Sequence, residues 1–245
     1  MVRVFLVLPD LSFAKAVALS EVGGVDVLVS YSILVMKPGM RDRLEAVRDR
    51  LGVVMLDSGA YHHARGVVDV DPVEYASFAW ENRRLWHLVV APDVPGNPGE
   101  TLRRTLIFDK HYPGEGYIPV IQGGRVEDYL GMLRELEAQG LASEGFLVGV
   151  GGLDGEKRRI AFLSKLLSKL PDKYRYHLFG VGARILRGLA RRGLLYKVYS
   201  VDSSAWLMEI RYRRRTVYKA SDLITAEILG IKGYLERVEY AIQLS

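Results

Sequence analysis

The chain has 245 residues, 49% of them hydrophobic and 26% charged, a composition typical of globular proteins and unlike that of disordered or collagen-like chains. It contains no cysteine, which excludes disulfides, zinc–thiolate sites, iron–sulfur clusters and a cysteine nucleophile. Lys and Arg outnumber Asp and Glu by 34 to 29, and the resulting net charge of +5 permits a nucleic-acid partner without indicating one.

Short apolar runs alternate with longer amphipathic segments along the whole chain. Most of the short runs are rich in Val, Ile and Leu, as parallel strands covered on both faces are. The expected strands cover 3–8, 25–31, 53–57, 87–93, 117–122, 146–151, 176–181 and 198–202. The expected helices cover 12–22, 40–51, 72–85, 99–110, 125–139, 155–170, 183–193 and 219–243.

Eight strands, each followed by a helix, predict an α/β fold, a single (β/α)8 TIM barrel domain over residues 1–245. An open doubly wound sheet would use fewer strands or carry a Gly-x-Gly-x-x-Gly turn after the first strand, which here ends in Leu-Pro-Asp. The start of the chain lacks a cleavable signal pattern, and no apolar run is long enough to span a bilayer. We therefore expect a cytoplasmic protein with no membrane partner.

Polar residues gather at the predicted C-terminal ends of the strands, where the active site of a TIM barrel forms. One carboxylate in such a place is often only the N-cap of the next helix, but several together indicate a site. No Lys or Arg closes any of these strands, which argues against a Schiff-base enzyme. The strand-end residues are Asp57, Asp93, Gln122 and Asp202, with glycine-rich turns at 149–152 and 180–182.

The order and spelling of these strand ends resemble the tRNA-guanine transglycosylase family. That family carries Asp-Ser-Gly-Gly-Phe/Tyr, a later Asp, Gln-Gly-Gly, Gly-Gly-Leu, a Met/Phe-Gly-Val-Gly turn and a final nucleophilic Asp. This chain has Asp-Ser-Gly-Ala-Tyr, Asp, Gln-Gly-Gly, Gly-Gly-Leu, Phe-Gly-Val-Gly and Asp in the same order over residues 57–202. Each motif is weak by itself, whereas the ordered set on strand ends is specific.

The resemblance implies a base-exchange glycosyltransferase that replaces guanine in a nucleic acid, DNA or tRNA, with a 7-deazaguanine through a covalent Asp–ribosyl intermediate. Asp202 matches the nucleophile and Asp57 the general acid/base. Tyr61 and Phe179 match the side chains that sandwich the base. The implied base-binding residues are Ser58, Tyr61, Asp93, Gln122, Gly151, Gly152, Leu153 and Phe179.

The chemistry is coherent apart from the family. Displacing a base from C1′ passes through an oxocarbenium-like state that a carboxylate can stabilise and then capture. A purine edge needs hydrogen-bonding groups such as a carboxylate and an amide, and its faces need flat apolar groups. Carboxylates crowded at one rim are also expected to separate in pKa, as an acid/base assignment requires.

The chain departs from the family's tRNA enzymes after the nucleophile. Those enzymes usually carry a zinc subdomain built on Cys and His, and a Pro-Thr-Arg segment; here Ser-Ser-Ala-Trp follows Asp202 and there is no Cys. No zinc-binding subdomain, no metal and no other cofactor is therefore expected. The shortened pattern resembles the branch that inserts 7-deazaguanines into DNA. The acceptor polymer, the inserted base, and a homodimer or partner subunit stay open.

A basic run with interleaved aromatics follows the proposed nucleophile. Its arginines could bind phosphates while Tyr212 or Tyr218 stacks on a base, or the run could be a solvated strand or loop. The candidate nucleic-acid-binding residues are Arg211, Arg213, Arg214 and Arg215.

Other polar segments have simpler interpretations. The arginines at 184, 187, 191 and 192 are expected to form an ordinary charged helix face. His62 and His63, with Arg65, are expected to lie in a loop at the rim and not to form a metal site. Trp206 is expected to pack behind the barrel rim. The turn at 180–182 occupies the usual phosphate-binding region of barrels. Two rival functions follow: a non-catalytic nucleobase- or nucleic-acid-binding barrel that needs a partner subunit, or an unrelated barrel enzyme acting on a phosphorylated metabolite.

Overall fold

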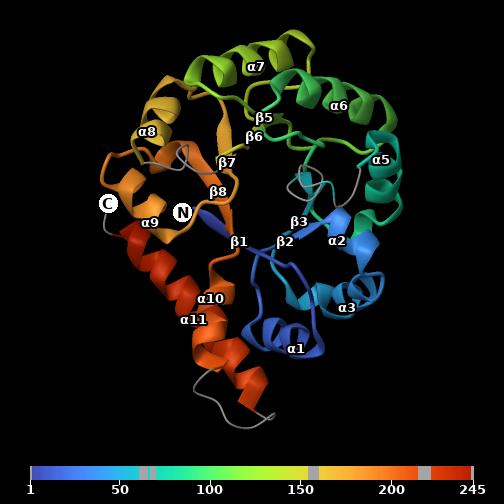
Figure 1. The fold of residues 1–245 in the computed structure, drawn as a ribbon, viewed down its shortest axis with the longest axis vertical. Coiled ribbons are helices and arrows are strands. Elements are labelled where there is room, and N and C mark those ends of the chain that lie inside the picture. The colour runs from blue at the N-terminus through green and yellow to red at the C-terminus, as the bar shows by residue number, and fades with distance from the viewer. Residues whose placement is uncertain (1, 61–65, 67–69, 154–159, 215–221, 244–245) are drawn as a thin grey trace.

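The computed structural model describes residues 2–60, 66, 70–153, 160–214 and 222–243. Its eight strands form one all-parallel sheet that curls on itself inside a ring of helices (Figure 1). The strands are β1 Arg3–Val7, β2 Val27–Ser30, β3 Val54–Asp57, β4 Leu88–Val89, β5 Val120–Ile121, β6 Leu147–Val150, β7 Arg175–Leu178 and β8 Val198–Ser203. The predicted (β/α)8-like architecture is confirmed.

The sheet is incompletely closed at one seam. Its strand order is β4-β3-β2-β1-β8-β7-β6-β5, so the two edges are β4 and β5. A single isolated parallel bridge between Val90 and Ile118 joins these edges. The two strands that meet here are only two residues long, much shorter than the predicted ranges 87–93 and 117–122.

Helices cover the outer face of the sheet, and two of them were not expected from the sequence: α2 and α10. The 3-10 turns are η1 Arg48–Arg50, η2 Arg83–Leu85 and η4 Leu195–Lys197. The helices are α1 Phe13–Val22, α2 Tyr31–Met36, α3 Gly39–Val47, α5 Pro72–Glu81, α6 Pro98–His111, α7 Val126–Ala138, α8 Ile160–Lys169, α9 Ala183–Ala190, α10 Trp206–Arg214 and α11 Asp222–Gln243. None of the helices in the described ranges is long and apolar enough to cross a membrane.

The basic run belongs to helix α10 through Arg214, which corrects the strand-or-loop expectation. Trp206 and Ile210 lie four residues apart and are both buried, so they form one face of a helix. The indole N–H of Trp206 donates to the carbonyl of Val7, 3.0 Å away. Ile210 packs against Gly230 of α11, where a Cβ would lie 3.1 Å from the Ile210 Cα. Tertiary packing of this apolar face therefore sets the helix.

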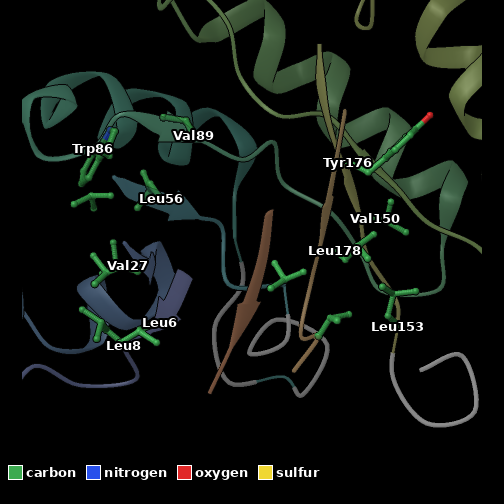
Figure 2. Packing of buried hydrophobic residues seen from close by; sticks show 14 of the residues in the cluster. Leu6, Leu8, Val27, Leu56, Trp86, Val89, Val150, Leu153, Tyr176 and Leu178 are labelled. Carbon is green, nitrogen blue, oxygen red and sulfur yellow. The ribbon is translucent and has the colours of Figure 1, made fainter. Parts of the chain in front are cut away.

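Two apolar layers hold the sheet in place. Between sheet and helices, Leu6 lies beside Val27 and Val150 beside Leu178, each pair on neighbouring strands (Figure 2). Inside the barrel a smaller cluster fills the space enclosed by the strands. Because side chains alternate along a strand, the next inward position beyond this cluster lies at the C-terminal end of each strand. The inner cluster consists of Phe5, Leu28, Met55, Val90, Ile118 and Val120.

Candidate active site

Three carboxylates and one amide meet above this inner apolar layer. Asp57 follows the inward-facing Met55 by two residues, and Gln122 follows Val120 in the same way. Asp202 is on β8, and Asp93 comes four residues after β4. Desolvation raises the pKa values of Asp57 and Asp93; the charge of Asp202 adds to the first shift and the charge of Asp57 to the second. The residues selected from the sequence thus share one electrostatic environment.

A β-bulge aims Asp202 into the barrel. Tyr176 pairs with Val198 whereas His177 pairs with Ser200, which leaves Tyr199 as an extra residue in β8. An extra residue reverses the alternation of side chains along a strand. Val198 accordingly packs in the outer core, while Asp202 lies opposite the inward-facing Phe5. Without the bulge, the regular alternation that starts at Val198 would turn Asp202 outward.

Two donors converge on one oxygen of Asp202. The backbone N–H of Gly180 donates to Oδ1 at 2.9 Å, and His177 Nε2 lies 3.2 Å from the same atom. Asp202 is only 6% exposed. Hydrogen bonds to a carboxylate favour its charged form and fix its orientation. Both of these contacts are with Oδ1, and neither uses Oδ2.

His177 is a site residue that the sequence analysis missed. Its side chain is fully buried, and its Nδ1 lies 2.8 Å from Ser200 Oγ while its Nε2 faces Asp202. The edge of the ring meets Phe179, with 4.4 Å between ring centroids. Because a carboxylate oxygen accepts hydrogen bonds, the proton on Nε2 is directed at Asp202 Oδ1. The available signal was its position in β7, two residues before Phe179 and so on the same inward face.

Desolvation makes the half-buried Asp57 a weaker acid than an ordinary aspartate. Ser30 Oγ donates to Asp57 Oδ2 at 3.2 Å, and the backbone N–H of Gly59 donates to the same oxygen at 2.9 Å. Desolvation outweighs these bonds and, with the charge of Asp202, raises the pKa of Asp57 to about 6. Gly59 has φ +89° and a Cβ there would collide with Ser32, so the turn requires glycine.

Asp93 and Gln122 form a buried hydrogen-bonded pair. Gln122 Nε2 donates to Asp93 Oδ2, and the N–H of Gly96 donates to Gln122 Oε1 at 3.4 Å. Burial, followed by the charge of Asp57, raises the pKa of Asp93 to about 8. This carboxyl group is therefore largely protonated at neutral pH and can donate a hydrogen bond as well as accept one.

The glycines of the Gly-Gly-Leu motif make room for this pair. A Cβ at Gly151 would clash with the Gln122 amide nitrogen, and a Cβ at Gly152, whose φ is +64°, would lie 2.5 Å from the amide oxygen. Tyr129 OH donates to the Gly151 carbonyl at 2.9 Å and holds this segment. Leu153 places its side chain in the core between sheet and helices, so only its backbone belongs to the motif.

Phe179 and Ser58 are at the site, and Tyr61 is outside the described residues. The ring of Phe179 is half-buried and lies over Gly149, where a Cβ would come within 2.7 Å of it. Ser58 is buried, and its hydroxyl has no hydrogen-bond partner in the part of the chain that the structure describes. An unpaired buried hydroxyl beside Asp57 is a candidate contact for a ligand.

The remaining sequence candidates divide between α10 and the undescribed segments. Arg211 is exposed on α10, and the backbones of Arg213 and Arg214 complete that helix. The side chains of those two residues, and all of Arg215, lie outside the described part, as do His62, His63 and Arg65. Trp206 is fully buried, which confirms that it packs behind the rim.

The site thus offers two carboxylic acids with raised pKa values, of which Asp93 is buried and Asp57 half-buried, and a third carboxylate held by an imidazole and a backbone N–H. That set suits nucleophilic and acid/base chemistry. Over the described residues, no group of three or more His, Asp or Glu is arranged to hold a metal ion. Neither a protein-family model nor a curated protein matches the chain.

Proposed function

We propose that the chain is a base-exchange glycosyltransferase that replaces guanine in a nucleic acid with a 7-deazaguanine. The observation that carries the proposal is the meeting of Asp202, Asp57 and the Asp93–Gln122 pair at one end of the barrel, each in a different environment. The ordered motifs over residues 57–202, which resemble those of tRNA-guanine transglycosylases, supply the substrate class.

Asp202 and Asp57 divide the chemistry between them. Oδ2 of Asp202 attacks C1′ of the target nucleotide, and the bond from C1′ to N9 of guanine breaks with its electron pair going to the base. Asp57, with a pKa of about 6, supplies the proton that the leaving base needs. The incoming base returns that proton to Asp57, attacks C1′ and releases Asp202, so two inversions give net retention.

The Asp93–Gln122 pair recognises the polar edge of the base. A guanine edge presents N–H donors beside the O6 acceptor. The neutral Asp93 carboxyl and the Gln122 amide each offer a donor and an acceptor at one point of the site. The ring of Phe179 provides a flat apolar surface for one face of the base. A pocket built to pair both donors and acceptors rejects bases that lack them, because its own polar groups are then left unpaired.

Covalent trapping tests the proposal. The protein is incubated with tRNA and separately with guanine-containing DNA, quenched in denaturant and separated on denaturing gels. In parallel, uptake of radiolabelled guanine into each polymer reports exchange without knowledge of the natural base. The variants are Asp202→Asn and, as a matched control, Asp49→Asn, which changes an exposed carboxylate on η1.

A retarded band with one polymer, present in wild type and Asp49→Asn and absent in Asp202→Asn, would support the chemistry and identify the acceptor. A band that persists in Asp202→Asn would refute the nucleophile assignment. Absence of both a band and label uptake with either polymer, for a protein of native circular dichroism, would count against exchange and favour a binding protein that requires a partner.

A further inference from the structure

A pocket of about 410 Å³ lies next to Asp202 on the side of α9 and α11. It is bounded by the turn that enters α9, by Ala205 after β8, and by the α11 residues Tyr234 and Arg237. Gly180 belongs to both sites: it lines this pocket, and its N–H donates to Asp202 Oδ1. A ligand here is therefore separated from the carboxylate by a single residue.

Three arginines make this pocket a site for an anion. Arg184, Arg187 and Arg237 all line it. Arg237 is paired with Glu209, whereas Arg184 and Arg187 have no ion pair with any of the described residues. Nε of Arg187 is buried and lacks a hydrogen-bond partner within the same residues. Buried donors without partners are costly, and an anion would satisfy them.

Two further donors point to a ligand at the same place. Helix α9 starts at Ala183 after Gly182, which has no side chain to cap the first N–H groups, and this end of a helix favours negative charge. Tyr234 is 3% exposed and its hydroxyl has no hydrogen-bond partner in the described ranges. Burial raises the pKa of that hydroxyl, and the nearby Ser203 side chain lowers it.

We infer that this pocket binds a phosphate group of the nucleic-acid backbone, adjacent to the nucleotide whose C1′ is attacked by Asp202. The phosphate class follows from guanidinium groups, which pair with phosphate oxygens in a bidentate manner, and from a helix N-terminus. The nucleic-acid source rests on the proposed function: a phosphate and C1′ belong to the same nucleotide unit, so holding the phosphate beside Gly180 sets the sugar against Asp202. A small phosphorylated compound is the other source of the same group.

The first test uses inorganic phosphate and does not depend on base exchange. Phosphate is titrated calorimetrically into the wild type, Arg184→Ala, Arg184→Lys and Arg237→Ala, at an ionic strength held constant with chloride. The matched control is Arg191→Ala, an exposed arginine at the opposite end of α9. We expect roughly tenfold weaker phosphate binding in both alanine variants, partial recovery in Arg184→Lys and no change in Arg191→Ala.

The second test separates the two sources with a guanine-containing oligonucleotide, as DNA and as RNA, and with ribose 5-phosphate. If the backbone is the ligand, Arg184→Ala weakens oligonucleotide binding. It also reduces the slope of log affinity against log salt concentration by the contribution of about one phosphate contact. Weaker ribose 5-phosphate binding with unchanged oligonucleotide binding would overturn the nucleic-acid assignment in favour of a phosphorylated metabolite.

The outcomes also separate this inference from the proposed function. Equal phosphate and oligonucleotide binding by wild type and both alanine variants would overturn the phosphate site, even in a protein that exchanges bases. Loss of phosphate and oligonucleotide binding in these variants, in a protein that shows neither a covalent band nor guanine uptake, would leave the phosphate site standing and overturn the exchange reaction.

Discussion

Asp202 and Asp93 lie at similar depth at the same end of the barrel, being 6% and 7% exposed, yet their neighbours differ. Asp202 faces an imidazole and a backbone N–H, both directed at one oxygen. Asp93 faces the Gln122 amide, the charge of Asp57 and the more weakly acting charge of Arg104, and burial raises its pKa to about 8. The same residue type thus has different surroundings at the two positions. Donors around Asp202 favour an anion, whereas the surroundings of Asp93 favour the neutral acid.

This difference assigns the two halves of the site to different tasks. An oriented anion suits attack on a cationic sugar centre, whereas a neutral carboxyl suits a hydrogen-bonded base edge. Asp57, whose pKa is raised to about 6, interacts electrostatically with both. Chemistry is therefore expected on the β8 side of the mouth and recognition on the β4–β5 side.

The largest expected effect separates the task of Asp202 from that of Asp93. Asp202→Asn removes the attacking oxyanion, so we expect formation of the covalent band to fall by at least about 10³-fold. Asp93→Asn keeps a hydrogen-bonding side chain of the same shape and should instead raise the KM for guanine with a much smaller change in kcat. Label-uptake kinetics over a range of guanine concentrations measure both. Equal losses of kcat in the two variants would show that the halves do not have separate tasks.

The next effect concerns His177, a positioning residue that acts through Asp202. Replacing it by Leu removes the donor to Asp202, and a misoriented carboxylate should form the covalent band about 10²-fold more slowly. His177→Gln retains an N–H that can reach Asp202 and should recover part of the rate, and neither variant should change the KM for guanine. A parallel rise in KM, or equal rates for Gln and Leu, would reduce His177 to a packing residue. Thermal unfolding provides the control for stability.

A third prediction concerns stability and pH, and it needs no substrate. Because the pKa of Asp93 is raised to about 8 in the folded protein, folding takes up a proton between the ordinary aspartate pKa and pH 8. The stability that depends on this proton is lost as the pH rises through 8, so the free energy of unfolding should fall by about 2 kcal/mol from pH 6 to pH 8.

Asp93→Asn cannot titrate and should remove most of that slope. Asp49→Asn, at an exposed position, should keep it. Urea unfolding at several pH values measures the difference. The same slope in Asp93→Asn and wild type would contradict the neutral state assigned to Asp93.

Much of the fold and of the candidate site followed from residue patterns. The strand ends at Asp57, Gln122 and Asp202 could be located because apolar runs stop there, and glycines follow the first two. The parallel arrangement brings such ends together. The start of α5 at Pro72 could be predicted as well. Asp71 caps the helix by accepting hydrogen bonds from the N–H groups of Val73 and Glu74 at 2.8 and 3.0 Å, and Pro72 is in the first turn.

What escaped prediction depends on register and tertiary packing. The bulge at Tyr199 is fixed by pairing with β7, and no local signal in the sequence marks it. His177 became a site residue only through that register, opposite Ser200 and below Asp202. Helix α10 escaped because its apolar face, Trp206 with Ile210, is narrow within an arginine-rich run and is recognised only against Val7 and α11.

The smallest expected effect concerns an arginine on the β8 side of the site. Arg211 is exposed on α10, the helix that follows β8, and so belongs to the side of the mouth where the chemistry is expected. Arg211→Ala should weaken oligonucleotide binding a few-fold and reduce the slope of log affinity against log salt by about 0.7–0.9, the contribution of one phosphate contact. Binding of free guanine, on the Asp93 side, should not change.

The matched control for this prediction is Arg50→Ala. Arg50 is also exposed, but it precedes β3 and therefore lies at the opposite end of the barrel. Fluorescence anisotropy over a series of salt concentrations measures both slopes. Equal slopes for Arg211→Ala and wild type would remove α10 from the interface. A matching loss in Arg50→Ala would mean that net charge, and not a surface at the mouth, governs binding, because a local contact depends on position whereas a long-range field depends chiefly on total charge.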